Sequence, residues 1–152
     1  MKRLAQFRQQ QAGLGWTFAI SLPAAACAQL GYSGEGLALV QEAFDAAERH
    51  GDYFWEWELH RLKGDLLLAR SAVDEAEACY RLAATVAERQ GARFLALRAV
   101  ISLARLHRQQ GRNDTSIRLQ SLSETFAEGF DTDDLRNARL ELALSAGIAP
   151  TG

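Results

Sequence analysis

Residues 53–90 read YFWEWELHRLKGDLLLARSAVDEAEACYRLAATVAERQ, and this stretch decides the fold. The first arm, 58–68, repeats its apolar residues at helical spacing. The second arm carries an apolar stripe at intervals of three and four residues, made of Ala76, Cys79, Tyr80, Ala83, Val86 and Ala87. A short turn is expected between the arms, at 71–74. Because two amphipathic helices cannot bury both stripes alone, the hairpin predicts further helices stacked against it.

The composition of the whole chain is typical of helices. Among its 152 residues Pro occurs twice, while Ala, Leu, Glu, Gln and Arg dominate. Charged residues make up 24% and the formal net charge is -2, which argues against a general nucleic-acid binder or a membrane-surface protein. No apolar run approaches the length of a membrane span. Cys27 and Cys79 fall on apolar stripes and are expected to be reduced. We expect an all-α, soluble, cytoplasmic protein.

Glycines and capping residues divide the chain into helices. The glycines that follow apolar stripes are expected to end helices, at Gly31, Gly51, Gly91, Gly111 and Gly147. Asp74, the pair at 113–114 and Asp131 are expected N-caps. Pro23 predicts a kink, or a fresh helix start capped by Ser21. The predicted helices are 16–30, 35–50, 53–70, 74–90, 93–110, 115–127 and 131–146, preceded by a helical remnant at 1–12.

A repeat of about 40 residues runs through the chain, inside the range of helical-repeat arrays. The pair Ala-Glu recurs at 47–48, 87–88 and 127–128. Small residues recur in the same register, at Gly31, Ser71 and Gly111, at Gly36, Ala76 and Ser116, and at Ala43, Ala83 and Ser123. Small residues at fixed places in each hairpin allow the helix backbones to approach closely.

The predicted architecture is therefore a right-handed superhelical stack of antiparallel helix pairs in one domain over 1–152. Its predicted parts are repeat 1 at 14–51, repeat 2 at 52–91, repeat 3 at 92–129 and a C-terminal capping helix at 131–146.

The central hairpin resembles the tetratricopeptide repeat. The internal spacing of that pattern is matched by Gly64, Leu67, Ala76, Tyr80 and Ala83. His60, Lys63 and Glu88 depart from it, since they stand where the pattern prefers tryptophan, leucine and proline. The period here is longer than the roughly 34 residues of a standard repeat, which implies longer helices.

Most of the chain, 36–144, also resembles the C-terminal helical repeats of large bacterial signalling ATPases and adenylate-cyclase-type transcriptional regulators. The segments that carry this resemblance are GLALV at 36–40, ELHRLKGDLLL at 58–68, LARL at 103–106 and FAEGFDTDDL at 126–135. The chain has no glycine-rich phosphate loop ending in Lys-Ser or Lys-Thr, and no cyclase region. The resemblance implies a sensing or partner-docking tail, either detached or working as a free-standing relative.

The first helix of each repeat is expected to line a concave surface, which such proteins use for binding. In the tetratricopeptide register the groove positions are Glu58, Arg61, Asp65 and Leu68 in the central repeat, and Arg98, Ile101, Arg105 and Arg108 in the third. The planar forks of arginines on one face suit carboxylates or phosphates. The alternative is an ordinary solvated helix face. The carboxylate clamp of co-chaperone repeats is absent, because Ser21 and Ala25 stand at its lysine and asparagine places.

A second candidate surface consists of apolar residues. Trp55 and Trp57 belong to an aromatic cluster at 53–57, which is expected to pack between repeats, with one tryptophan alternatively lining the groove or an interface. An unfinished stacking face that favours a homodimer is expected from Leu4, Phe7 and Trp16. In the helix 16–30 the expected buried positions are Phe18, Leu22, Cys27 and Leu30.

Enzyme chemistry finds little support in the sequence. Neither cysteine has a histidine in helical register with it, as an activated nucleophile requires. His50, His60 and His107 are scattered rather than paired as zinc ligands usually are. The GLG and GEG triplets at 13–15 and 34–36 follow no strand. We expect a non-catalytic protein–protein interaction scaffold without a cofactor or metal, which binds a protein or peptide in its groove and contacts neither nucleic acid nor membrane. The alternatives are a self-assembling structural module and a small-molecule sensor tail.

Overall fold

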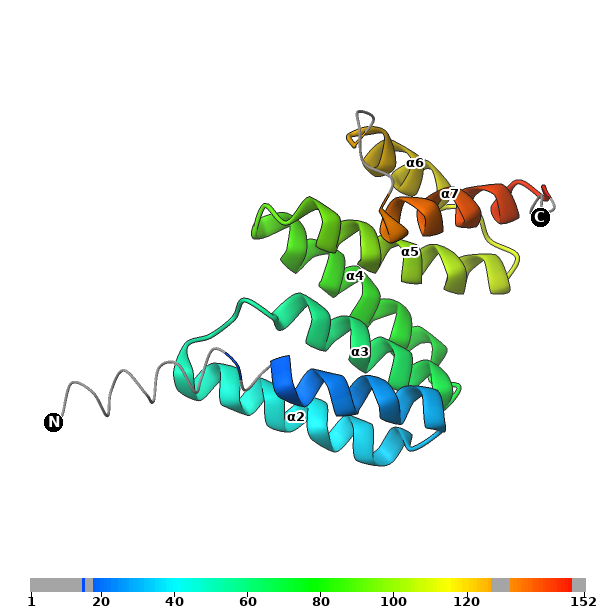
Figure 1. Cartoon of the computed structure of the whole chain (residues 1–152). Helices are drawn as coiled ribbons and strands as arrows, with labels where there is room; N and C mark the ends of the chain where they lie inside the picture. The colour runs from blue at the N-terminus through cyan, green and yellow to red at the C-terminus, as the bar shows by residue number, and fades with distance from the viewer. Residues whose placement is uncertain (1–14, 16–17, 127–131, 149–152) are drawn as a thin grey trace, which may run out of the picture. The chain divides into compact units, whose positions relative to one another are not determined.

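The computed structural model describes residues 15, 18–126 and 132–148. Every regular element in these ranges is a helix, which confirms the predicted all-α class (Figure 1). An unlabelled helix occupies 18–30. The labelled helices are α2 (Ser33–His50), α3 (Glu56–Ala69), α4 (Val73–Arg89), α5 (Arg93–Gln109), α6 (Ser116–Glu124) and α7 (Asp133–Ser145). None of the described helices is both long enough and apolar enough to cross a membrane.

α2 and α3 begin at Ser33 and Glu56 rather than at 35 and 53, and two of the predicted N-caps do not cap a helix. Ser21 lies inside the first described helix, where its Oγ donates to the Phe18 carbonyl at 2.6 Å, so a fresh start capped by Ser21 is wrong. Asp74 does not cap α4. The Ala76 amide donates to the Ala72 carbonyl at 3.0 Å, and Asp74 lies within the first turn.

α7 begins at a well-defined cap. The Thr132 side chain accepts a hydrogen bond from the Leu135 amide at 3.4 Å. Asp133 and Asp134 follow in the first turn, where negative charge is favourable at the positive end of the helix dipole. Asp131, the predicted cap, and the predicted remnant helix at 1–12 lie outside the described residues.

The 40-residue repeat is visible in the backbone. Gly31, Ser71 and Gly111 follow every second helix, namely the helix 18–30, α3 and α5, and have φ values of 82°, 61° and 72°. Ser71 therefore adopts at its turn the left-handed conformation that glycine adopts at the two equivalent turns. The sequence register and the backbone register coincide at these three turns.

The chain forms two compact units, Met1–Cys79 and Tyr80–Gly152. The boundary falls inside α4, between Cys79 and Tyr80. The predicted single domain over 1–152, with its repeat boundaries, stays a prediction.

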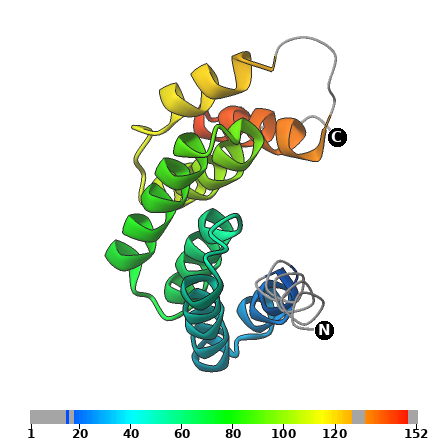
Figure 2. The same ribbon diagram turned by 90° about the vertical axis from the view of Figure 1, so that its left-hand side faces the viewer.

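In the first unit the helix 18–30 runs antiparallel to α2, and α3 packs against α2 (Figures 1 and 2). The core of this unit consists of buried apolar side chains, namely Ile20, Ala24, Val40, Ala43, Leu59, Leu62 and Leu66. Gly36 on α2 faces Leu66 of α3 and Cys27 of the first helix at close range. The expectation that small residues allow close helix approach is met at this position.

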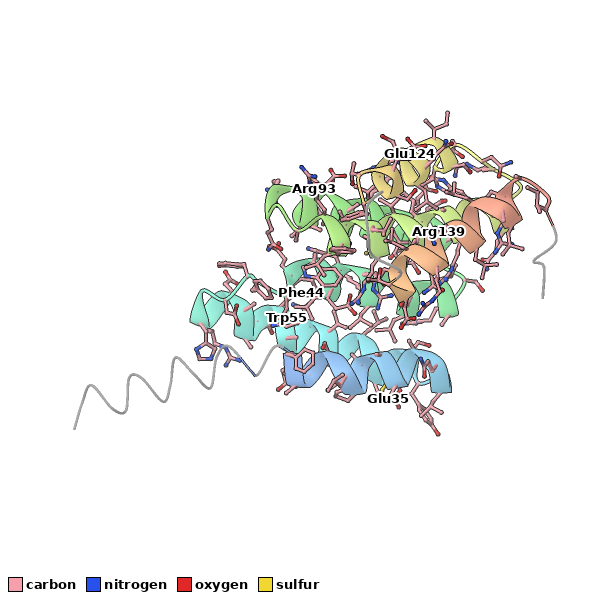
Figure 3. All side chains as sticks on the ribbon, turned by 45° about the horizontal axis from the view of Figure 1, so that its top comes forward. Glu35, Phe44, Trp55, Arg93, Glu124 and Arg139 are labelled. Atoms are coloured by element: carbon pink, nitrogen blue, oxygen red, sulfur yellow. The ribbon has the colours of Figure 1, made fainter. Side chains whose placement is uncertain are left out.

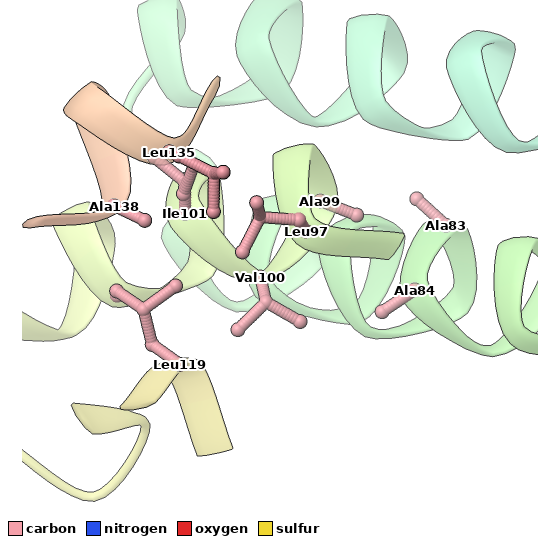
Figure 4. Close-up of a cluster of buried hydrophobic side chains, with 10 residues drawn as sticks. Ala83, Ala84, Leu97, Ala99, Val100, Ile101, Leu119, Leu135 and Ala138 are labelled. Carbon is pink, nitrogen blue, oxygen red and sulfur yellow. The ribbon is translucent and has the colours of Figure 1, made fainter. Parts of the chain in front are cut away.

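In the second unit α7 packs against both α5 and α6. The core of this unit is a second apolar cluster, made of Ala83, Ala84, Leu97, Ala99, Val100, Ile101, Ala104, Leu119, Leu135 and Ala138. Figure 4 shows Leu135 and Ala138 on α7 beside Ile101 of α5, and Leu119 of α6 beneath Val100. The predicted C-terminal helix thus contributes side chains to the core of its own unit.

Candidate interaction surface

The predicted groove positions of α5 face α7. Arg98, Ile101, Arg105 and Arg108 follow one another at helical spacing along one side of α5. Opposite them, α7 presents a row at similar spacing, made of Asp134, Leu135, Ala138 and Glu141. We call these two rows together the α5–α7 seam.

Ion pairs hold both ends of the α5–α7 seam. Arg98 Nε donates to both carboxylate oxygens of Asp134 at 2.9 Å. Arg108 Nε donates to Glu141 Oε1 at 2.7 Å. Arg105 Nε lies 3.5 Å from Glu141 Oε2, so this carboxylate lies between two guanidinium groups. The carboxylates of α7 therefore complement the arginines of α5 at both ends of the seam.

Between the ion pairs the seam is apolar. Ile101 is buried in the same cluster as Leu135 and Ala138 (Figure 4). A charged row with a buried apolar centre is the usual layout of a protein interface, in which a desolvated core is surrounded by a polar rim.

The two sides of the seam differ in exposure. The Glu141 side chain is 2% exposed, whereas those of Arg98, Arg105 and Arg108 are 51%, 47% and 34% exposed. The hydrogen bond and the charge of Glu141 raise the pKa of Arg108 above its ordinary value. A buried carboxylate needs such partners, because an unpaired buried charge is costly.

The other predicted groove arginine, Arg61, belongs to the first unit and is engaged within its own helix. Arg61 Nε and Nη2 donate to the two oxygens of Glu58, and Nη1 donates to Asp65, all at 2.8 Å. The bonds to Glu58 and Asp65 outweigh the opposing effect of burial and raise the pKa of Arg61. These three side chains form a salt-bridge network along α3, and Leu68 follows it, partly buried.

The aromatic residues divide into a core member and a partly exposed group. Trp57 is 1% exposed. Trp55 contacts Phe18 with ring centroids 4.9 Å apart and Phe54 at 5.2 Å. Phe44 of α2, labelled with Trp55 in Figure 3, contacts His60 with ring centroids 4.8 Å apart. Packing, the preferred prediction for the cluster, fits the burial of Trp57, and Trp55 lies nearer the surface.

The helix 18–30 exposes three apolar residues that we predicted to be buried. Phe18, Leu22 and Leu30 are 43%, 58% and 69% exposed, while Ile20 and Ala24 are buried. The predicted burial of those three residues is wrong, because the helix turns a different apolar face to α2. Residues 9–34 contain no charged side chain. Leu4, Phe7 and Trp16, the predicted interface residues, lie outside the described residues.

The described residues include side chains of types that can act as nucleophiles, bases or metal ligands. Burial raises the pKa of the Cys79 thiol, which lowers its thiolate fraction at neutral pH. His107 is buried, and its Nδ1 lies 2.5 Å from Thr115 Oγ1. In the described part of the chain no group of three or more His, Cys, Asp or Glu residues is arranged to hold a metal ion.

The carboxylates of α7 were not among the predicted site residues. Their sequence signal is a pair of acidic residues seven apart, Asp134 and Glu141, which lie on one helix face. Comparisons with protein families, with curated proteins and with solved structures give no match.

Proposed function

We propose that this chain is a non-catalytic, tetratricopeptide-like interaction module whose helix pairs form a right-handed superhelical stack. The observation that carries the proposal concerns the side of α5 formed by Arg98, Ile101, Arg105 and Arg108, which we call the α5 face. Its arginines pair with carboxylates of α7, and Ile101 packs in the apolar centre between the ion pairs. A surface built in this way suits an amphipathic segment of a partner protein.

Two further observations support the proposal. The left-handed turns at Gly31, Ser71 and Gly111 recur every 40 residues, as stacked helical repeats of equal length require. The raised pKa of the Cys79 thiol is the opposite of what a cysteine nucleophile needs. The resemblance to the repeat tails of signalling ATPases favours a regulatory docking role in the cytoplasm.

Affinity purification of the tagged full chain from its native lysate, followed by mass spectrometry, tests this function. We expect stoichiometric partners that are lost when Arg98, Arg105 and Arg108 are all replaced by Ala. The matched control is Arg118→Ala, because Arg118 lies in the same unit but pairs with Glu88 at 2.6 Å, away from the seam. Partners that remain bound to the triple variant would overturn the assignment of the α5 face.

A second candidate function is self-assembly through the helix 18–30. Its exposed Phe18, Leu22 and Leu30 form an apolar face, and the lack of charge over 9–34 removes like-charge repulsion between two copies. Exposed apolar surface of this kind favours association.

Analytical ultracentrifugation over a range of concentrations tests self-assembly. We expect a dimer that Leu22→Glu dissociates. Leu82→Glu is the control, because it places the same charge on an exposed leucine of α4, 44% exposed in the wild-type chain. A concentration-independent monomer would rule the second function out.

A further inference from the structure

The α7 helix presents the features of a bound ligand to the face of α5. Its carboxylates, Asp134 and Glu141, are seven residues apart and bracket Leu135 and Ala138 on the same side. The buried residues of α7 are Leu135, Ala138 and Glu141. Leu142 of α7, partly buried, also packs against the hydrophobic cluster of the unit.

We propose that α7 is an internal competitor, and that the α5 face binds an acidic amphipathic helix of a partner in its place. The partner helix carries two carboxylates seven residues apart, with small or branched apolar residues between them. This inference rests on the proposed interaction function and adds to it the class of ligand and the means of regulation.

The structure supports exchange for two reasons. The Arg98 side chain is 51% exposed, so solvent weakens the ion pair with Asp134 at this end of the seam. α7 has 13 residues, and a helix of about this length has little stability of its own in water. A partner helix with the same carboxylates and a longer apolar stripe gains more from the α5 face than α7 does.

Tethering gives α7 an advantage that sets the apparent affinity of any competitor. A segment joined to its site acts at an effective concentration on the order of millimolar. The observed dissociation constant of a partner rises as the fraction of open α5 faces falls. Weakening α7 alone must therefore tighten binding of a helix added in trans.

A labelled peptide with the sequence of residues 132–146 serves as the probe, titrated into the full chain and followed by fluorescence anisotropy. In the variant D134R/E141R, both changes lie on α7 and leave the α5 face intact. Because the new arginines repel those of α5, we expect this variant to bind the wild-type peptide roughly tenfold more tightly, or better, than the wild-type chain does.

The control is a charge swap. The peptide carrying D134R and E141R should not bind the wild-type face. The same peptide should bind the chain variant R98E/R105E/R108E, in which the signs of both partners are reversed. Equal affinity of the D134R/E141R chain and the wild-type chain for the wild-type peptide overturns the inference, as does failure of the charge swap to restore binding.

Hydrogen exchange keeps the test decisive if a variant chain unfolds. In the wild-type chain, unlabelled peptide at about 1 mM should accelerate exchange of α7 amides while those of α5 stay protected. Unchanged exchange of α7 overturns the inference. Partners lost from the triple arginine variant, together with an α7 that no peptide displaces, would leave the proposed function standing and remove only the exchange.

Discussion

Gly36 lies where α2 is packed tightly against two other helices. A Cβ at this position would overlap Leu66 Cδ2 and lie 3.0 Å from Cys27 Cβ, whereas a Cβ at Gly34 would have no atom within 4 Å. Both glycines belong to α2, so replacing either by Ala gains similar helix propensity. The difference between the two variants isolates the close approach.

We expect Gly36→Ala to lower the free energy of unfolding by about 1–3 kcal/mol, because overpacking forces a neighbour to move. Gly34→Ala should raise it by up to about 1 kcal/mol. Urea denaturation measures both. An equal gain in the two variants would show that α2 has room at Gly36.

Ser71 is the one non-glycine residue with a positive φ in the described part of the chain, at 61°. Side chains pay roughly 1–2 kcal/mol for this conformation. We therefore expect Ser71→Gly to raise the free energy of unfolding by up to about 1 kcal/mol. Ser121→Gly, an exposed change inside α6, should instead lower it by about 0.5–1 kcal/mol. Thermal denaturation of both variants checks the signs.

His60 couples stability to pH. Burial lowers its pKa in the folded chain from the ordinary value of 6.5, and the positive charge of Lys63 lowers it further. The Glu56 carboxylate, 3.6 Å away, acts in the opposite direction but does not cancel the effect of burial. The unfolded chain therefore takes up this proton first as the pH falls. The stability associated with neutral His60 is complete above the unfolded pKa and is lost as the pH falls toward the folded one.

We expect the wild-type chain to lose more unfolding free energy between about pH 7.5 and about pH 5.5 than the His60→Gln variant does. His50→Gln, a change at an exposed histidine, is the control and should keep the wild-type difference. Identical pH dependence of the wild-type chain and His60→Gln would contradict the assignment.

At the level of helices, the sequence predicted the ends of α2, α4 and α5 well because a glycine with positive φ follows each of them closely. α5 was expected at 93–110 and spans Arg93–Gln109. The buried face of the helix 18–30 was missed for a physical reason. That helix is uncharged and rich in Ala, so several of its faces are apolar and periodicity cannot select one.

Of the two rows that form the α5–α7 seam, the sequence predicted the row on α5 but not the row on α7. The row of arginines on α5 follows from helical spacing alone, within one stretch of sequence. Its counterpart on α7 does not, because Arg98 and Asp134 are 36 residues apart, and Arg108 and Glu141 are 33 apart. Contacts at such separations depend on how α7 packs on α5, which local patterns do not determine.

The unequal burial of the two carboxylates of α7 gives an element-scale prediction. Glu141→Ala should lower the free energy of unfolding by about 1–3 kcal/mol, because its loss leaves two guanidinium groups without their buried partner. Asp134→Ala should cost less than about 1 kcal/mol, since Arg98 is half exposed.

A double-mutant cycle of Arg108→Ala and Glu141→Ala should give a coupling of about 1 kcal/mol. The cycle with Arg105→Ala should give less, because that pair is longer, at 3.5 Å. Zero coupling for Arg108 would mean that this ion pair does not hold α7.

At the scale of the whole molecule, the two hydrophobic clusters share no residue. One consists of side chains from 20–66, and the other of side chains from 83–138. In the helical-repeat class that we propose for this chain, stability is approximately a sum of the stabilities of single repeats and of the interfaces between neighbours. Damage to one cluster is then expected to loosen its own unit more than the other.

Paired core variants followed by hydrogen exchange test this independence. Leu119→Ala and Leu59→Ala each remove a fully buried leucine, one from each cluster, and each should cost about 2–5 kcal/mol. Leu119→Ala should accelerate exchange in α5, α6 and α7 more than in α2 and α3, and Leu59→Ala should do the reverse. Uniform acceleration by both variants would instead favour the single cooperative domain over 1–152, because a chain that opens only as a whole exchanges all its core amides through one transition.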